Sequence, residues 1–549
     1  MNTVTQLFEE AMQTHSNSVN SLADLDGHNT STATIAALGR GVLKACVSDQ
    51  AYANIKSLRA SFESIAEQNI PIYGVTTGFG ELVHNWVDID HEGALQVNLL
   101  RSHCAGVGPL FGREEVRAMM AARLNSLVRG YSAVRPVVVK QLIRYLDADI
   151  TPAVPEIGSL GASGDLAPLS HIAITLIGEG YVLAPDGSQI PTAVALNDHD
   201  IPPIVLKYKE GLSLINGTSA MTGLACLLLE AMRDQIAQAE IITALSLEAL
   251  KASTGAYMPN GHDVAKPHPG QIRSAENIRR LFHGTKLMSA HEDLTAEMKD
   301  RVGEEKNTGT GVFIQKAYTL RCVPQVLGAI RDTLSHCETV VWRELNSSND
   351  NPLFFEDGQI FHGGNFHGQQ VAFAMDFMAI AATQLGVVSE RRLNRFLNPY
   401  LNNGLPEFLA SSHAGLSCGF AGAQYPATAL IAENRTICSP ASIQSVPSNG
   451  DNQDVVSMGL IAARNARRII SNNSYILAIE LLAACQAVDI MKVADGLSPV
   501  GRAVYEFVRT QVPMLDADRY MTNDIEWVAC ALREGKLKVV AKTAGVEIA

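Results

Sequence analysis

The sequence lacks the features that mark several common protein classes. Its 549 residues carry a net charge of −13 and contain no long run of Lys or Arg, which argues against nucleic acid or an anionic membrane surface as a partner. No two of its nine cysteines stand at CxxC spacing, which excludes zinc ribbons and thioredoxin-type redox motifs. Their scattered positions predict no disulfide framework, as is usual in a reducing compartment.

Membrane and export signals are also missing. The longest stretch without Asp, Glu, Lys or Arg, residues 408–432, is interrupted by Ser, His, Gln and Pro. A membrane span needs about 20 predominantly apolar residues, so we expect none here. The N-terminal segment MNTVTQLFEEAMQTHSNS has no basic region followed by an apolar run, and we expect no signal peptide. The sequence predicts a soluble, cytoplasmic protein.

The dominant positive signal is helical periodicity. Apolar residues recur at spacings of three and four over six ranges, which predicts helices at 38–68, 220–253, 311–336, 371–394, 456–489 and 516–534. Long helices with little charge belong in the middle of a bundle, so we predict a mainly α fold with a long central helical bundle.

Strand signal is thin and confined to two short hairpins, 180–183 with 189–191 and 353–355 with 359–361. Mixed structure gives way to long helices near residue 210. We therefore predict a smaller mixed N-terminal domain (1–210) and a domain of long central and C-terminal helices (211–549).

The connecting segments have an unusual composition. Six of them are rich in Gly, Asn, Ser and His although they lie between apolar helices: 73–80, 157–171, 214–219, 346–352, 361–368 and 447–454. Linkers are normally polar and charged, so these loops are predicted to line a buried polar site.

The segment GSLGASGD, residues 158–165, offers the sharpest local chemistry. Its composition fits a tight turn or an anion-binding nest. A nucleophilic serine elbow needs G-x-S-x-G, and Asp165 stands where the second Gly is required. A third possibility is backbone self-condensation. The Gly164 nitrogen attacks the Ala162 carbonyl carbon, and Ser163 then loses its hydroxyl as water, which leaves a five-membered ring with an electrophilic methylidene.

Further motifs occur in order along the chain: YGVTTGFG at 73, LINGT at 214, QKAYTLR at 315, NDNP at 349, GNFHG at 364 and NQD at 452. With them, Ala162-Ser163-Gly164 resembles the signature of ammonia-lyases and aminomutases that carry a 4-methylidene-imidazol-5-one (MIO) group. The resemblance covers about residues 30–530 and is strongest to bacterial tyrosine 2,3-aminomutases, then to tyrosine ammonia-lyases. It implies a fumarase/aspartase-like helical fold, an MIO group formed autocatalytically from this triad, no metal or nucleotide cofactor, and a homotetramer whose active sites draw residues from three chains.

The resemblance also implies residue roles. Tyr73 would remove the substrate β-proton, which requires a site that favours its phenolate. Tyr318 would lie near the amine and the electrophile, and Arg321, on the same helix face, would bind the carboxylate through two hydrogen bonds. Asn216 would touch the prosthetic group and the carboxylate. The remaining expected lining residues are Asn349, Asn365, Phe366 and Gln453. His362 and His367 have no acidic residue nearby, so we expect no metal.

The predicted substrate is L-tyrosine. The resemblance implies that His103 and Tyr425 bond a phenol hydroxyl, although the pair Ser102-His103 is shared with histidine ammonia-lyases. NQDVVS and QKAY differ from the corresponding runs of the histidine enzymes, which argues against histidine. The amine would either leave with release of 4-coumarate or return to give β-tyrosine, and the resemblance favours β-tyrosine. The alternatives are a histidine ammonia-lyase that makes urocanate and a non-catalytic helical scaffold. The GSSxMPxKxN loop of fumarase/aspartase-type lyases does not occur.

Overall fold

The computed structural model describes residues 21–548 except 69, 303–308 and 412–414. Contacts group the chain into two compact units. Unit 1 comprises Met1–Glu230, Cys337–Asp376 and Pro440–Arg464; unit 2 comprises Ala231–His336, Phe377–Ser439 and Asn465–Ala549. The two-domain division at residue 210 stays a prediction, since this grouping joins two later segments to unit 1.

Unit 1 combines short helices with small sheets. Its helices are α2 (Thr32–Gly39), α3 (Asp49–Ala66), α4 (Glu92–His103), α5 (Arg113–Val128), α6 (Pro136–Asp147), α7 (Leu166–Leu176), α8 (Thr192–Asp198) and α9 (Glu210–Ile215). Strand β1 (Leu22–Asp24) pairs in parallel with β2 (Lys44–Cys46). The antiparallel pairs are β3 (Val107–Leu110) with β5 (Pro155–Ile157), and β6 (Tyr181–Leu183) with β4 (Thr151–Pro152) and β7 (Gln189–Pro191). The predicted hairpin β6–β7 is thus confirmed, as is β8 (Leu353–Phe354) with β9 (Ile360–Phe361).

Helix α5 forms the centre of unit 1. Every residue from Val116 to Val128 is buried, including two arginines, Arg117 and Arg123. An amphipathic surface helix would expose one face, so α5 is enclosed by other elements all round. Its buried polar side chains must find partners inside the unit, and those partners include the loops around the candidate site.

The predicted single helix at 38–68 is wrong at its start. Helix α2 ends at Gly39, Gly41 has a left-handed φ of +73°, and strand β2 follows. A new helix, α3, begins after Ser48, whose hydroxyl accepts a hydrogen bond from the Ala51 amide. Apolar periodicity continued across this turn and hid it.

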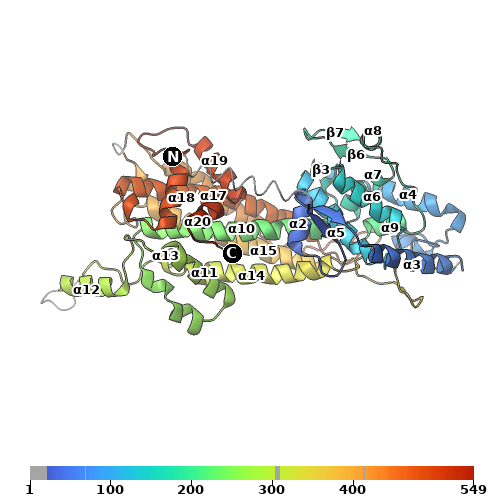
Figure 1. Cartoon of the computed structure of the whole chain (residues 1–549), viewed down its shortest axis with the longest axis horizontal. Helices are drawn as coiled ribbons and strands as arrows, with labels where there is room; N and C mark the ends of the chain where they lie inside the picture. The colour runs from blue at the N-terminus through green and yellow to red at the C-terminus, as the bar shows by residue number, and fades with distance from the viewer. Residues whose placement is uncertain (1–20, 69, 303–308, 412–414, 549) are drawn as a thin grey trace. The chain divides into compact units, whose positions relative to one another are not determined.

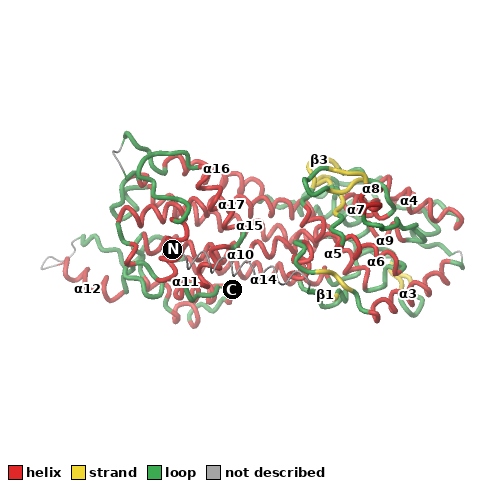
Figure 2. Tube along the Cα trace, turned by 45° about the horizontal axis from the view of Figure 1, so that its top comes forward, coloured by secondary structure: helices red, strands yellow, loops and turns green. Residues whose placement is uncertain are grey.

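Three of the predicted helices are confirmed as long helices, α10 (Ser219–Ala249), α15 (Gln369–Leu397) and α17 (Gly459–Met491), and α14 (Val323–Leu345) is a fourth long helix. They lie side by side in both views (Figures 1 and 2). The predicted helix at 311–336 is wrong at both ends, since α14 begins at Val323, with Pro324 in its first turn, and continues to Leu345. The other helices of unit 2 are α11 (Pro269–Leu281), α12 (His291–Val302), α13 (Tyr318–Arg321), α16 (Ala421–Ile437), α18 (Pro499–Arg509), α19 (Thr522–Arg533) and α20 (Lys536–Thr543).

A buried carboxylate joins three of these helices within unit 2. Glu480 on α17 pairs with Arg392 on α15 at 2.5 Å, and both side chains are essentially inaccessible. Ser246 of α10 donates to the same carboxylate at 2.8 Å. These directional contacts fix how the helices slide along one another, which apolar packing alone does not do.

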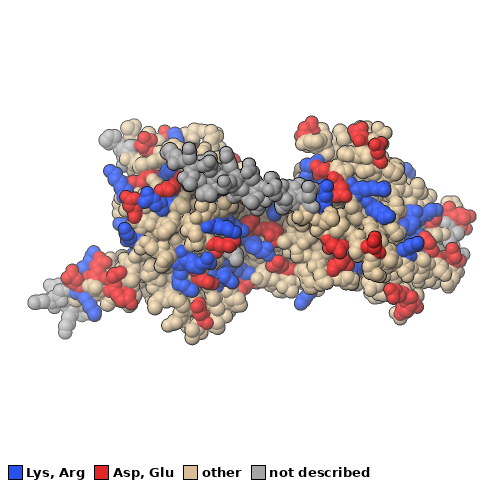
Figure 3. Space-filling view, viewed as in Figure 1, with Lys and Arg blue, Asp and Glu red and all other residues tan. Residues whose placement is uncertain are grey.

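Helices α15 and α17 are long and apolar enough to cross a membrane by length and composition. In the structure, 67% and 78% of their apolar windows are buried within the protein. The core helices of soluble proteins pass the same test, so this feature carries no membrane assignment. On the face shown in Figure 3, basic and acidic side chains are interspersed. All nine cysteines are free thiols.

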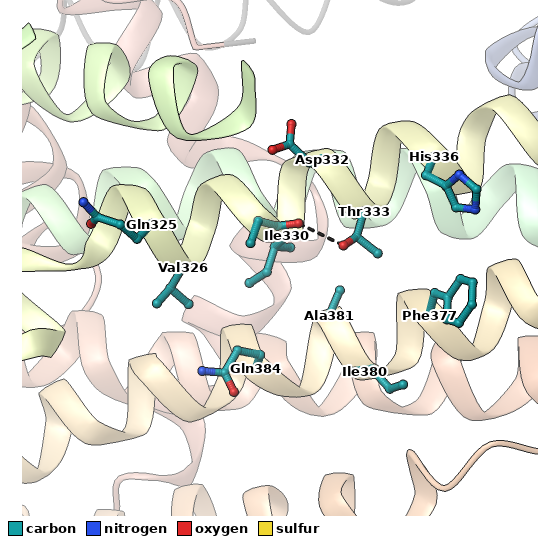
Figure 4. A pocket seen from close by; sticks show the side chains of 11 residues that line it. Gln325, Val326, Ile330, Asp332, Thr333, His336, Phe377, Ile380, Ala381 and Gln384 are labelled. Carbon is teal, nitrogen blue, oxygen red and sulfur yellow. Dashed lines mark hydrogen bonds between the residues drawn. The ribbon is translucent and has the colours of Figure 1, made fainter. Parts of the chain in front are cut away.

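Between α14 and α15 lies an open, largely apolar groove of about 650 Å³ in unit 2. Figure 4 shows Val326 of α14 above Gln384 of α15, and His336 of α14 above Phe377 of α15. Phe377 is 43% exposed. An apolar helix face left open in this way is typical of an interface.

A buried ion pair supports the loop after α14 in unit 1. Lys209 Nζ lies 2.6 Å from Asp350 Oδ2, and neither side chain is accessible to solvent. Ser132 also donates to the carboxylate at 2.8 Å. The pair attaches the NDNP segment to the start of α9.

We expect Lys209→Met to lower the free energy of unfolding by about 3–5 kcal/mol, because it leaves the Asp350 charge buried without its partner. The matched control is Lys207→Met two residues away. Lys207 forms a half-exposed pair with Glu92 at 3.4 Å, and its loss should cost about 1 kcal/mol or less. Urea unfolding followed by circular dichroism measures both. Equal losses in the two variants would contradict the assignment.

Candidate active site

A cavity of about 620 Å³ opens in unit 1 where the Gly-rich loops meet. Seven predicted site residues line it: Tyr73, His103, Ala162, Ser163, Gly164, Asn216 and Gln453. They come from segments far apart in the sequence, so the fold brings together what motif order alone suggested. Much of the remaining lining is apolar: Phe79, Leu82, Leu95, Leu99, Leu160, Leu166 and Leu212.

The GSLGASGD segment forms a tight turn immediately before α7. Gly161 and Gly164 adopt left-handed φ values of +67° and +73°, which explains the need for glycine at both ends. At the first end, Ser457 Oγ donates to the Gly161 carbonyl at 3.0 Å. At the second end, the Asp165 amide donates to the Gly217 carbonyl at 2.7 Å. The turn is therefore fixed on both sides.

Ser163 lies at the centre of this turn, and both its carbonyl oxygen and its hydroxyl accept hydrogen bonds. Its carbonyl oxygen accepts Asn216 Nδ2 at 2.9 Å and the Gly217 amide at 3.3 Å. Its hydroxyl accepts Gln453 Nε2 at 3.1 Å. In an MIO group the Ser163 carbonyl would be the carbonyl of the imidazolone ring, and two N–H donors on its oxygen would stabilise negative charge there. Asn216 Oδ1 is buried and has no partner among the residues that the structure describes. These residues fit the MIO group.

Asp165 is a residue that the sequence reasoning missed. Its buried carboxylate accepts Ser159 Oγ at 2.7 Å and the Met221 amide at 2.8 Å. Burial raises the pKa of this carboxyl to about 6. The side chain connects the turn to the first residues of α10. The only sequence signal was its position at the end of the Gly-rich segment.

Tyr73 lies in the cavity with its phenol oxygen accepting the Gly80 amide at 2.9 Å. Its ring meets Phe79 edge-on, with the centroids 6.1 Å apart. Burial raises the pKa of Tyr73, and the Gly80 amide offsets only part of that rise. The described contacts include one donor to the phenol oxygen, and the expectation that the complete site favours the phenolate stays a prediction.

His103 ends α4 with its ring at the cavity. Nδ1 lies 2.9 Å from the Leu99 carbonyl oxygen, and a carbonyl can only accept, so Nδ1 carries the hydrogen. In the neutral ring, Nε2 then presents a lone pair. Ser102 Oγ also lies 3.0 Å from Nδ1. His103 is therefore prepared to accept a hydrogen bond from a substrate hydroxyl.

Three predicted lining residues do not line the cavity. Asn349 is buried behind the LINGT loop, where its Oδ1 accepts Arg123 Nη1 at 2.9 Å and its Nδ2 donates to Thr218 Oγ1 at 2.8 Å. Asn365 is exposed and lies within 3.5 Å of the Ser348 carbonyl, and Phe366 is half-buried. Their substrate contacts stay predictions, and Asn349 has a supporting position instead.

Tyr318, Arg321 and Tyr425 belong to unit 2 and do not line the cavity of unit 1. The Arg321 guanidinium stands 4.8 Å from the Tyr318 ring centroid, as expected for one helix face. Tyr318 and Tyr425 are 71% and 74% exposed. Arg321 Nε is buried without a hydrogen-bond partner in the described part of the chain. Their roles are predictions that unit 1 alone does not test.

Neither loop histidine stands in a cluster of metal ligands. His362 Nε2 accepts the Tyr73 amide at 3.4 Å, and His367 Nε2 lies 3.2 Å from the Val455 carbonyl. Within the described residues there is no group of three or more His, Cys, Asp or Glu side chains that could hold a metal ion.

Known proteins place this site in a family. Residues 30–510 match the model of the aromatic amino acid lyases. The chain is 70% identical to a tyrosine ammonia-lyase of Cupriavidus metallidurans, over 96% of this chain and 99% of that protein. It is 59% identical to an MIO-dependent tyrosine 2,3-aminomutase of Streptomyces globisporus, over 91% and 93%.

The fold agrees with these sequence matches. The crystal structure of the Streptomyces globisporus tyrosine aminomutase superposes with a TM-score of 0.94 at 55% identity, covering 96% of this chain and all of that one. The predicted fold class and family resemblance are confirmed. The chain is an enzyme of the aromatic amino acid lyase family.

Proposed function

We propose that this enzyme eliminates ammonia from L-tyrosine with an MIO group formed autocatalytically from Ala162-Ser163-Gly164. The arrangement that supports this most directly is the Ser163 turn, whose carbonyl oxygen accepts Asn216 and Gly217 inside the cavity that holds Tyr73. The names of the two relatives support tyrosine as the substrate, as does the Nε2 lone pair of His103.

The side chains divide the work. The MIO group supplies an electrophile that makes the amino nitrogen a good leaving group. Tyr73 accepts the β-proton at its phenol oxygen, which Gly80 holds by one hydrogen bond. Asn216 and the Gly217 amide donate to the Ser163 oxygen as charge develops. Arg321 binds the substrate carboxylate, with Tyr318 near the amine.

We propose release of 4-coumarate as the main outcome. The family resemblance favoured β-tyrosine, but 70% identity to a tyrosine ammonia-lyase supports release. The second candidate is the 2,3-amino shift, which the 59% identity and the TM-score of 0.94 to the aminomutase support. The two outcomes differ in how long the site retains the unsaturated product.

We also propose a cytoplasmic homotetramer in which other copies bring Tyr318, Arg321 and Tyr425 to the cavity of unit 1. The exposure of both tyrosines, the unpartnered Arg321 Nε and the open apolar groove of α14 and α15 support this assembly. The substrate is a small amino acid, and no nucleic acid or membrane partner is proposed.

Incubation of the purified enzyme with L-tyrosine and, separately, with L-histidine tests the proposal. Chiral liquid chromatography with mass detection should show 4-coumarate and little early β-tyrosine. Ser163→Ala, which cannot form the methylidene, should make neither product. β-Tyrosine as the main early product would support the amino shift and overturn release. Urocanate from histidine, with tyrosine untouched, would overturn the substrate assignment.

Tyr73→Phe should lower kcat by about 10²–10⁴-fold, because the phenol oxygen that accepts the proton is gone. The wild-type profile carries a second signature. A base with a raised pKa is mostly protonated at neutral pH, so kcat/KM should rise between about pH 7 and about pH 9 as the phenolate fraction grows. Steady-state rates measured across this range check both. A profile that falls with pH would exclude Tyr73 as the titrating base.

His103→Leu should lower the preference for tyrosine over phenylalanine, expressed as the ratio of kcat/KM values, by at least about 100-fold. A site that bonds a hydroxyl discriminates strongly against the analogue without it. Ser102→Ala is the matched control, because it leaves the bond from His103 Nδ1 to Leu99 in place; its ratio should stay within about threefold. If both variants keep the wild-type ratio, a residue other than His103 binds the phenol hydroxyl of the substrate.

A further inference from the structure

Gly217 packs closely against Gly164 and against the side chains of Arg123 and Asn349. On one side its backbone meets Gly164, where an added Cβ would come within 2.6 Å of the Gly217 Cα. On the other side a Cβ on Gly217 would lie 2.7 Å from Arg123 Nη1 and 2.7 Å from the Asn349 carbonyl oxygen. Arg123 and Asn349 therefore lie directly against Gly217, whose carbonyl accepts the Asp165 amide at the second end of the Ser163 turn.

Arg123 is held in a demanding environment. Its side chain is about 1% exposed, and its guanidinium donates to Asn349 Oδ1 at 2.9 Å and to the Ser213 carbonyl. Its Nε has no partner among the described residues. Burial lowers its pKa to about 10. A buried cation with an unsatisfied nitrogen is costly, and such costs concentrate at functional sites.

The same contacts extend along the LINGT loop. Asn349 Nδ2 donates to Thr218 Oγ1, and the Thr218 hydroxyl donates to the partly buried carboxylate of Glu344. Ser213, which accepts the other branch of the guanidinium, lies on α9 just before the loop. Arg123 is thus bonded directly to Ser213, which precedes Gly217, and through Asn349 to Thr218, which follows it.

We propose that Arg123 and Asn349 are positioning residues for formation of the prosthetic group: they hold Gly217 against Gly164 and so keep the turn at Ser163 bent for ring closure. This inference rests on the proposed function, because it concerns the same MIO group. Neither side chain touches the triad, and neither supplies an atom or a proton to it.

Ring closure itself is a double dehydration. A bond forms between the Gly164 nitrogen and the Ala162 carbonyl carbon, and the Ala162 oxygen leaves as water with the hydrogens of the Gly164 and Ser163 nitrogens. The hydroxyl of Ser163 then leaves as a second water with its Cα hydrogen, which creates the methylidene. No oxidant or reductant is needed. What the protein must supply is the conformation, and a misplacement of about 1 Å can cost about 10²-fold in rate.

The test is the intact mass of the purified full-length chain, with near-ultraviolet absorbance as a second readout. Wild type should be lighter than its sequence mass by two waters. Arg123→Met should give folded protein that retains both waters in most molecules. Arg117→Met is the matched control: Arg117 is also buried on α5, but it donates to the carbonyls of Gly39 and Leu146. We expect this control to be destabilised and fully cyclised.

Circular dichroism and gel filtration establish which variants fold. Arg123→Lys and Asn349→Ala break the same contacts more gently and serve if Arg123→Met does not fold. Complete loss of two waters in a folded Arg123 or Asn349 variant would overturn the inference and leave the proposed function intact. A wild-type chain at its full sequence mass would overturn the proposed function itself. If only Arg117→Met folds, the two residues serve folding and not ring closure, which also overturns the inference.

Discussion

The close approach of two glycine backbones, Gly164 and Gly217, is the constraint on which the rest of the site depends. It leaves no space for a side chain at either position. It places the Asn216 amide and the Gly217 N–H on the Ser163 carbonyl oxygen, so one contact sets both the bend of the chain and its hydrogen-bond donors. Loops alone do not hold two backbone segments this close together, because a loop has many conformations of similar energy.

Rigid elements meet at this contact. Helix α10 begins at Ser219, directly after the LINGT loop, and Asp165 accepts the Met221 amide in its first turn. Helix α7 begins on the other side of the Gly-rich turn, at Leu166. The turn is therefore the junction of two helix starts, each of which offers free backbone N–H groups that need acceptors. The buried carboxylate of Asp165 satisfies one such group and attaches the two starts to each other.

Much of the fold and part of the site could be predicted from sequence. Periodicity revealed α10, α15 and α17 because each runs for many turns, whereas the break between α2 and α3 was missed because apolar spacing continued through it. The triad, Asn216 and Gln453 were found through motifs. Arg123 and Asp165 were not, because a buried arginine in an apolar helix and an aspartate after a glycine turn leave no periodic or motif signal. Their importance comes from contacts with residues far away in the chain.

The layer behind the turn is rich in buried charge: Arg123, Lys209, Asp350 and Asp165 all lie out of solvent within unit 1. Apolar residues of similar volume would pack this layer at lower cost, since desolvation of ions often exceeds their mutual attraction. Apolar side chains, however, cannot hold a backbone carbonyl or amide at a set distance. Directional bonds from a guanidinium fork and from carboxylates can. A site whose chemistry depends on the bend of its own main chain needs such directional support more than a site built from side chains does. This need accounts for the concentration of charged residues behind the glycines and not in the cavity wall.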